Sequence, residues 1–165
     1  MTLALTMRRY GSPDDYWHAR EFLRSLRVAD PRPSGIWHIG SFDFWRWHWL
    51  ENVVERPPDE LRLWTTKNGE VRAVLVQGDP GVCHPMAAPA VASGRLLHEM
   101  LQVAESEFPT NLPEGRRAVF VWSDESDAML KAVLEARGYE LASGGHSTEN
   151  AAVYDDEAIA AFLDG

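Results

Sequence analysis

The sequence predicts an α/β (α+β) domain over residues 1–154, followed by a short C-terminal tail at 155–165. Three patterns predict this class: segments in which apolar and polar residues alternate, segments with apolar residues at helical spacing, and an Asn-Gly turn between two apolar runs. The length of 165 residues is usual for one domain, and the 45% hydrophobic content suffices for one core.

Charge and cysteine content narrow the possible partners. The formal net charge of −9 repels polyphosphates, so we expect neither nucleic acid nor an anionic membrane as a partner. The single cysteine, Cys83, cannot form an internal disulfide, which favours a reducing compartment. No apolar run is long enough to span a bilayer, and the N-terminal residues lack the features of a signal peptide. We therefore expect a soluble cytoplasmic protein.

The N-terminal region predicts a strand followed by a helix. Residues 3–10 alternate apolar and polar side chains, and Gly11 ends this pattern. A helix is expected from Pro13 to about Val28, because Ser12 can cap it and proline suits its first position. Two aspartates follow, where they complement the positive end of the helix dipole.

The middle of the chain predicts a second helical segment and a hairpin. Residues 36–54 are aromatic and charged and contain one glycine, as expected of a helix, and two prolines close the segment. The runs 61–66 and 71–77 flank the Asn-Gly pair at 68–69, which readily takes the positive φ angles of a tight turn. We expect these two runs to pair as antiparallel strands.

The C-terminal half predicts helices and strands in alternation. Apolar residues at helical spacing begin near Ala90 and continue to Phe108, which predicts a helix with one buried face. A second helix is expected at 128–137, where Gly138 fits the left-handed cap. The other extended segments are expected as strands: 82–84, ended by Pro85, then 118–122, and finally 139–141 and 151–154 around a Gly144-Gly145 turn.

This order of elements resembles the fold of the GNAT (GCN5-related) N-acetyltransferases over nearly the whole chain. Residues 84–101, His-Pro-Met-Ala-Ala-Pro-Ala-Val-Ala-Ser-Gly-Arg-Leu-Leu-His-Glu-Met-Leu, are similar without gaps to the family stretch HP-x-x-R-x-x-G-x-G-x-x-LL. Residues 134–139, Leu-Glu-Ala-Arg-Gly-Tyr, look like the family's LYEKxGF helix exit. The resemblance implies one mixed, mostly antiparallel sheet with helices on both faces, and acyl transfer from acetyl-CoA to an amine.

The resemblance also places the cofactor loop, and this sequence departs from the family there. The matching positions are Ala88, Val91 and Ser93, where the family has an arginine or glutamine and two glycines. Alanine cannot donate a side-chain hydrogen bond, and a β-branched valine hinders close approach of a phosphate. Gly94 and the Ser93 hydroxyl could restore part of the anion site if the loop is shifted by one residue. Val82 and His84, in the preceding strand, are also expected to border the cofactor.

Proton transfer would need a base and an acid. His84, at the end of the predicted strand, has a near-neutral reference pKa and is the candidate base; the alternative is a strand-end histidine with satisfied hydrogen bonds. The resemblance puts the usual acid tyrosine at Leu134, so that donor is missing, and Tyr139 is expected in the core. Three acidic residues before the last predicted helix could form an acidic site, but helix capping explains them better: Asp124, Glu125 and Asp127.

The segment 36–54 carries more aromatic surface than one helical stripe can bury. Trp45, Trp47 and Trp49 could therefore line an acceptor pocket or an interface, or could belong to the core. Arg46 could stack on these rings. No His-x-x-x-His or cysteine-rich pattern exists, so we expect no metal site.

Three functions remain open from the sequence. The first is an active acyl-CoA N-acyltransferase with a remodelled loop, using acetyl-CoA and a small-molecule amine. The second is a non-catalytic GNAT-like lobe, the degenerate half of a tandem arrangement, that forms a homodimer or packs against a second, competent GNAT-like domain. The third is a small-ligand binding module in which tryptophans enclose an apolar or cationic molecule.

Overall fold

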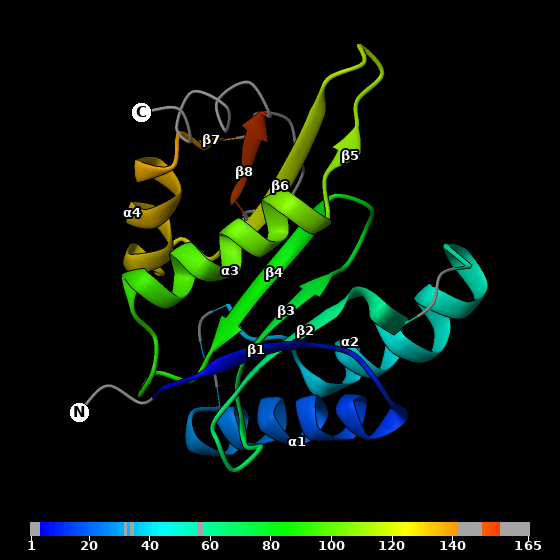
Figure 1. The fold of residues 1–165 in the computed structure, drawn as a ribbon, viewed down its shortest axis with the longest axis vertical. Coiled ribbons are helices and arrows are strands. Elements are labelled where there is room, and N and C mark those ends of the chain that lie inside the picture. The colour runs from blue at the N-terminus through cyan, green and yellow to red at the C-terminus, as the bar shows by residue number, and fades with distance from the viewer. Residues whose placement is uncertain (1–3, 32, 34, 56–57, 142–149, 156–165) are drawn as a thin grey trace. The chain divides into compact units, whose positions relative to one another are not determined.

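The computed structural model describes residues 4–31, 33, 35–55, 58–141 and 150–155. Its strands follow the order β1-β2-β3-β4-β6-β8-β7, with β5 beside β6, and only the β4–β6 pairing is parallel among the described pairings. The predicted mixed, mostly antiparallel sheet is therefore confirmed (Figure 1). Two compact units divide the chain, Met1–Val76 with Met86–Val91, and Gln77–Pro85 with Ala92–Gly165. They are called the N-unit and the C-unit.

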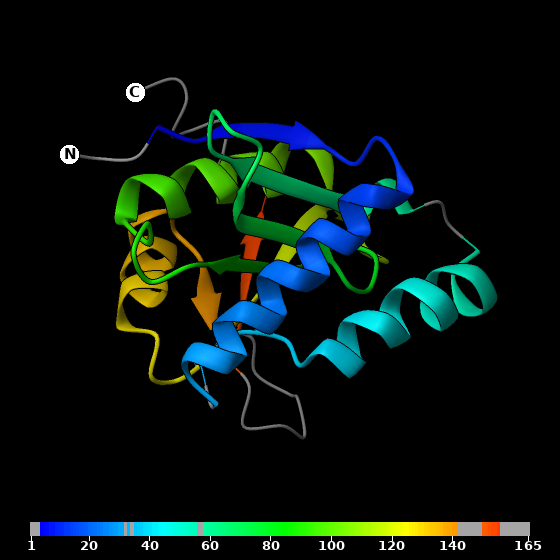
Figure 2. The same cartoon turned by 90° about the horizontal axis from the view of Figure 1, so that it is seen from below.

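The N-unit holds a three-stranded antiparallel sheet and the helices that cover it. Strands β1 (Thr6–Arg9), β2 (Leu61–Thr65) and β3 (Val71–Gln77) pair in this order. The helical elements are α1 (Pro13–Ala29), α2 (Ile39–Phe44), a π-helix (Trp45–Val53) and a 3-10 turn (Pro58–Glu60). Figure 2 shows α1 running across β2 and β3.

Local signals in the sequence account for the start of α1 and for the hairpin. Ser12 is the N-cap and Pro13 the first residue of α1, as predicted. The Asp15 carboxylate turns back and accepts the amide hydrogens of Gly11 at 2.7 Å and Ser12 at 3.2 Å. The predicted hairpin between β2 and β3 is also confirmed, with Gly69 at a φ of +83°.

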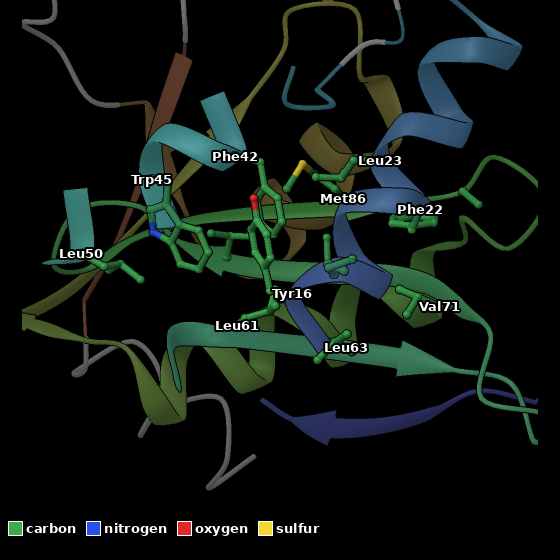
Figure 3. Close-up of a cluster of buried hydrophobic side chains, with 14 residues drawn as sticks. Tyr16, Phe22, Leu23, Phe42, Trp45, Leu50, Leu61, Leu63, Val71 and Met86 are labelled. Atoms are coloured by element: carbon green, nitrogen blue, oxygen red, sulfur yellow. The ribbon is translucent and has the colours of Figure 1, made fainter. Parts of the chain in front are cut away.

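The core of the N-unit lies between the helices and the sheet (Figure 3). Tyr16 and Leu23 of α1 meet Leu61 and Leu63 of β2, and all four side chains are at most 1% exposed. The Tyr16 ring also stacks on that of Phe42, with centroids 5.1 Å apart. Burial of these apolar side chains is what fixes the helices on this face of the sheet.

The segment predicted as one helix over 36–54 divides into α2 and the π-helix. Trp45 and Leu50 are both buried, and they are five residues apart, which is the hydrogen-bond spacing of a π-helix. An α-helix would instead have aligned Trp45 with Trp49. The wider turn therefore lets the side chains of Trp45 and Leu50 share the core face. Within the same π-helix, the side-chain amide of Asn52 donates to the His48 carbonyl at 3.2 Å.

The C-unit combines the start of β4 (Val82–Ala87) with two helices and four further strands (Figure 1). Its helices are α3 (Gly94–Glu107) and α4 (Ala128–Ala136). Its other strands are β5 (Thr110–Asn111), β6 (Arg117–Ser123), β7 (Glu140–Leu141) and β8 (Asn150–Asp155). Figure 1 shows α3 lying across β6 and beside α4. The predicted Gly144-Gly145 turn and the tail after Asp155 lie outside the described residues.

Two expected boundaries in this region were wrong. Strand β4 does not end at Pro85 but continues to Ala87, because its pairing with β6 covers only Val82 and Cys83 and the proline therefore interrupts no bond to β6. Helix α3 begins at Gly94 and not near Ala90, since Ser93 supplies the cap.

Other predictions in the C-unit are confirmed. Asp127 caps α4 by accepting the Leu130 amide hydrogen at 3.0 Å, and Gly138 takes a φ of +80° after that helix. Asp124 accepts the Ser126 amide hydrogen at 2.9 Å. Capping and turn formation thus account for these two aspartates. Strand β5 was not predicted, because its two residues gain their extended form from pairing with β6.

Candidate functional site

The start of α3 is the candidate anion site of the C-unit. The Ser93 hydroxyl accepts the Leu96 amide hydrogen at 3.2 Å, so this residue acts as the helix cap. Among the described residues, no acceptor is assigned to the amide hydrogens of Gly94 and Arg95, the first two of the helix. Unpaired amides at the positive end of a helix dipole favour a phosphate. Arg95 is exposed and adds a cation at the same end.

Gly94 leaves room at this helix start. A Cβ added there would meet only Val133 Cγ2, at 3.9 Å, within the described residues. Its φ is not in the left-handed region, so neither backbone conformation nor packing demands a glycine here. The position has the small size that a close ligand would need.

Ala88 and Val91, the other two loop residues matched to the family motif, pack in the core of the N-unit. Ala88 is buried in its core cluster, and Val91 packs against the same cluster. The amide of Ala88 donates to the Arg72 carbonyl at 2.9 Å, and the amide of Val91 donates to the Ala88 carbonyl at 2.9 Å. Both side chains and both amides are therefore engaged within the protein. The residues present fit a CoA pyrophosphate only at Ser93 to Arg95.

His84 lies in β4 just after its pairing with β6 stops at Cys83. Its ring stacks on Trp122 of β6, with centroids 6.0 Å apart and planes 10° from parallel. Val82, two residues earlier, is half-buried and pairs with Phe120. Burial lowers the pKa of the His84 imidazole to about 3. The ring is therefore neutral near pH 7 and has little affinity for a proton.

This depressed pKa predicts an acid-dependent loss of stability. The unfolded chain binds a proton at His84 near pH 6.5, whereas the folded chain does so only near the lowered pKa of about 3. The free energy of unfolding should therefore fall by up to about 1.4 kcal/mol for each unit of acidification in this window. Urea unfolding at pH 7 and pH 5 measures the loss, and His84→Gln should reduce it. An unchanged slope in that variant would contradict the assignment.

The region matched to the family's acid position contains no free hydroxyl. Leu134 is buried in α4, and the Tyr139 hydroxyl donates to Glu105 Oε1 at 3.1 Å. Burial and then the Glu105 carboxylate raise the pKa of Tyr139 far above its ordinary value. Arg137 Nε donates to the same Glu105 oxygen at 2.8 Å, and a second guanidinium nitrogen donates to Oε2. These contacts tie α3 to the end of α4.

The three candidate tryptophans of the π-helix have different environments. Trp45 is buried, Trp49 is partly buried against the core of the N-unit, and Trp47 is 45% exposed. Arg46 stacks on Trp47, with its guanidinium carbon 4.2 Å from the ring centroid, as predicted. Core packing therefore accounts for Trp45, whereas Trp47 is available at the surface.

A hydrogen-bonded network beside Trp47 was not predicted from the sequence. The indole nitrogen of Trp47 donates to the Tyr16 hydroxyl at 3.2 Å, and that hydroxyl donates to Asp43. Arg20 donates to both oxygens of Asp43, at 2.8 and 3.0 Å. Burial, reinforced by the Asp43 carboxylate, raises the pKa of Tyr16 to about 12. The phenol is thus a hydrogen-bond bridge between α1 and α2.

The described residues contain neither a metal-binding cluster nor a helix that could span a membrane. No group of three or more histidine, cysteine, aspartate or glutamate side chains is placed to hold a metal ion within that part of the chain. No helix among the described residues is long and apolar enough to cross a membrane.

Comparison with known proteins supports the topology. No family model and no curated protein matches the chain. Solved structures do match: a GNAT-family acetyltransferase of Listeria monocytogenes is 15% identical, with 94% of this chain and 98% of that one covered and a TM-score of 0.55. The chain has the fold of the GNAT acetyltransferases.

Two other solved structures with this fold agree. A GNAT-family acetyltransferase of Staphylococcus aureus has a TM-score of 0.58 and 10% identity, with 92% of this chain and 99% of that one covered. The spermidine/spermine N-acetyltransferase SpeG of Vibrio cholerae has a TM-score of 0.53 and 9% identity, with 96% and 99% covered. At these identities the likeness concerns the fold alone.

Sequence reasoning missed three residues in these regions: Arg95, Asp43 and Glu105. Arg95 directly follows Gly94, so the one-residue shift of the loop could have indicated it. Asp43 and Glu105 bind partners 23 to 34 positions away, and no local pattern marks such pairs.

Proposed function

We propose that this chain is a GNAT-fold lobe that does not itself catalyse acyl transfer and that serves dimerisation or the support of a competent GNAT domain. The observation that carries this proposal is the position matched to the family's proton donor, where Leu134 is buried and has no ionisable group. The hydroxyl of Tyr139, at the end of the same matched stretch, donates to the Glu105 carboxylate. A departing thiolate would find no proton donor at either position.

The candidate base supports the same proposal. A general base works best when its pKa lies near the operating pH, and the pKa of His84 is lowered to about 3. The loop residues Ala88 and Val91 also contribute to the core of the N-unit. His84, Ala88 and Val91 thus pack within the fold, and none of them is suited to a catalytic or cofactor-binding role.

A second candidate is acyl transfer from acetyl-CoA to a small amine, and the start of α3 favours it. The amides of Gly94 and Arg95 could hold a phosphate, and the Arg95 guanidinium could add a charge-assisted bond. SpeG, which shares the fold, is by name an acetyltransferase of polyamines. A polyamine such as spermidine is therefore the first acceptor to assay.

Calorimetric titration and a turnover assay separate the two candidates. We expect no release of free thiol from acetyl-CoA above its spontaneous hydrolysis when spermidine is supplied. Desulfo-CoA tests binding independently of chemistry. Turnover that is lost in Ser93→Glu, which places a negative charge at the start of α3, would overturn the proposal. Ser106→Glu is the matched control, because it makes the same change at the exposed C-terminal end of α3.

A further inference from the structure

The tip of the hairpin between β2 and β3 joins an asparagine to a glycine at the surface. Asn68 and Gly69 are both exposed, and a Cβ added to Gly69 would meet nothing within 4 Å among the described residues. Asn68 is the asparagine of this sequence that precedes a glycine, whereas Asn52 precedes a valine and Asn111 a leucine. The peptide nitrogen after Asn68 is therefore unshielded by side chains.

This pair of residues can react within the backbone. Once a base has removed its proton, the Gly69 nitrogen can attack Cγ of Asn68, and the bond from Cγ to the side-chain nitrogen breaks with release of ammonia. Water then opens the cyclic imide, giving aspartate if it attacks Cγ and isoaspartate if it attacks the backbone carbonyl carbon. The net change is the hydrolysis of one amide by water, with no oxidant or reductant. Glycine favours the attack because it has no Cβ beside the nitrogen.

Thr66 holds the hairpin tip in a closed form. Its carbonyl accepts the amide hydrogen of Gly69 at 2.9 Å, and its amide donates to the Glu70 carbonyl at 2.9 Å. Its hydroxyl accepts the amide hydrogens of Asn68 and Glu70, both at 3.3 Å. The nitrogen that would attack is thus engaged in a hydrogen bond, so the reaction requires the tip to open.

The tip is the part of this hairpin that can open most easily. Residues 67–70 are all exposed, whereas every residue of β2 is buried. Within the described part of the chain, no hydrogen bond is assigned to the side-chain amide of Asn68. The side-chain amide of Asn52, in contrast, donates to the His48 carbonyl at 3.2 Å. The reacting group of Asn68 is therefore held less firmly than that of Asn52.

We propose that Asn68 is a site of spontaneous deamidation and that Thr66 sets the rate by holding the hairpin tip closed. This modification is independent of the proposed function. It adds a negative charge next to Glu70, which pairs with Arg72 at 3.1 Å, in a chain that already carries a net charge of −9. Isoaspartate also inserts a methylene into the backbone, so it does not fit the closed tip.

Mass spectrometry of the chymotryptic peptide that follows Trp64 tests the site. The whole chain is incubated at mildly alkaline pH, and this peptide should gain the mass difference between an amide and a carboxylic acid. The gain should be at least about tenfold faster than in the peptides that contain Asn52 and Asn111, because a side chain after the asparagine obstructs the attack. Equal rates at the three asparagines would overturn the proposed site.

Two variants of Thr66 test its role. Thr66→Val removes the hydroxyl that accepts two amide hydrogens, so it should speed the conversion of Asn68 at least about threefold. Thr66→Ser is the matched control, because it keeps the hydroxyl, and its rate should stay within about twofold of that of the unaltered chain. An unchanged rate in Thr66→Val would overturn the role of Thr66.

If Thr66→Val does not fold, the unaltered chain still decides. Amide hydrogen exchange should be faster at Gly69 than at Ala88, whose amide donates to the Arg72 carbonyl within the N-unit. Equal protection of the two amides would overturn the proposal that the tip opens. The chain unfolded in guanidinium should convert Asn68 faster than the folded chain, and equal rates would show that the closed tip restrains nothing. None of these measurements involves acetyl-CoA, so their failure leaves the proposed function untouched.

Discussion

Arg137→Ala is expected to lower the free energy of unfolding by about 3 to 5 kcal/mol, because it leaves the buried Glu105 carboxylate without its cation. The side chains of Glu105 and Arg137 are 4% and 13% exposed. Arg137 donates to both carboxylate oxygens, and only the Tyr139 hydroxyl would remain as an assigned donor after the change. Urea unfolding at pH 7, followed by circular dichroism, measures the loss.

Two controls separate the buried charge from the loss of a contact. Arg24→Ala removes an exposed pair with Glu21, whose nitrogen and oxygen atoms are 2.6 Å apart, and should lower the stability far less than Arg137→Ala, because solvent screens this pair. The double variant Glu105→Leu with Arg137→Leu removes both charges and should be more stable than Arg137→Ala. A loss in Arg137→Ala as small as that in Arg24→Ala would show that Glu105 does not depend on this partner.

The pair between Glu105 and Arg137 could not be predicted from the sequence. Ser12, Asp127 and the Asn-Gly turn were predicted because each acts on residues within a few positions of itself. Arg137 contacts a side chain 32 positions earlier, and both residues look like ordinary charged positions on helices. Such pairs depend on how α3 and α4 pack, which no local pattern specifies.

The boundaries of α3 and of the π-helix show the same limit at shorter range. The alanine-rich stretch after Ala88 favours a helix, yet α3 begins only at Gly94, after the cap residue Ser93. Helical periodicity would align Trp45 with Trp49, yet burial of Leu50 selects a wider turn. In both places a packing or capping interaction overrides intrinsic propensity.

The family resemblance predicts which residues would form the candidate site, but not the environment of each of them. The family resemblance located Ala88, Val91, Ser93 and Leu134 as departures from the expected pattern. Only the structure shows that Ala88 and Val91 contribute to the core of the N-unit and that Ser93 caps α3. A departure from a motif does not by itself reveal whether the new residue has another structural task.

Gly81→Ala is expected to cost about 2 to 4 kcal/mol of unfolding free energy, for two reasons that act together. Gly81 has a φ of +79°, a conformation that alanine adopts with strain, and an added Cβ would lie 2.4 Å from Thr110 Cγ2. The glycine carbonyl accepts the Phe120 amide hydrogen at 2.7 Å where the β4–β6 pairing begins. A shift of this turn would therefore disturb the parallel pair that leads to His84.

Gly69→Ala separates the two causes of that loss. Gly69 has a φ of +83° and no neighbour within 4 Å of an added Cβ among the described residues, so only the backbone strain of about 1 kcal/mol applies. Thermal and urea unfolding should place Gly81→Ala well below Gly69→Ala in stability. Combining Gly81→Ala with Thr110→Gly removes the obstructing side chain and should recover part of the difference. If the two single variants were equally stable, the close approach of Gly81 to Thr110 would have no energetic consequence, and the turn would be held by its backbone conformation alone.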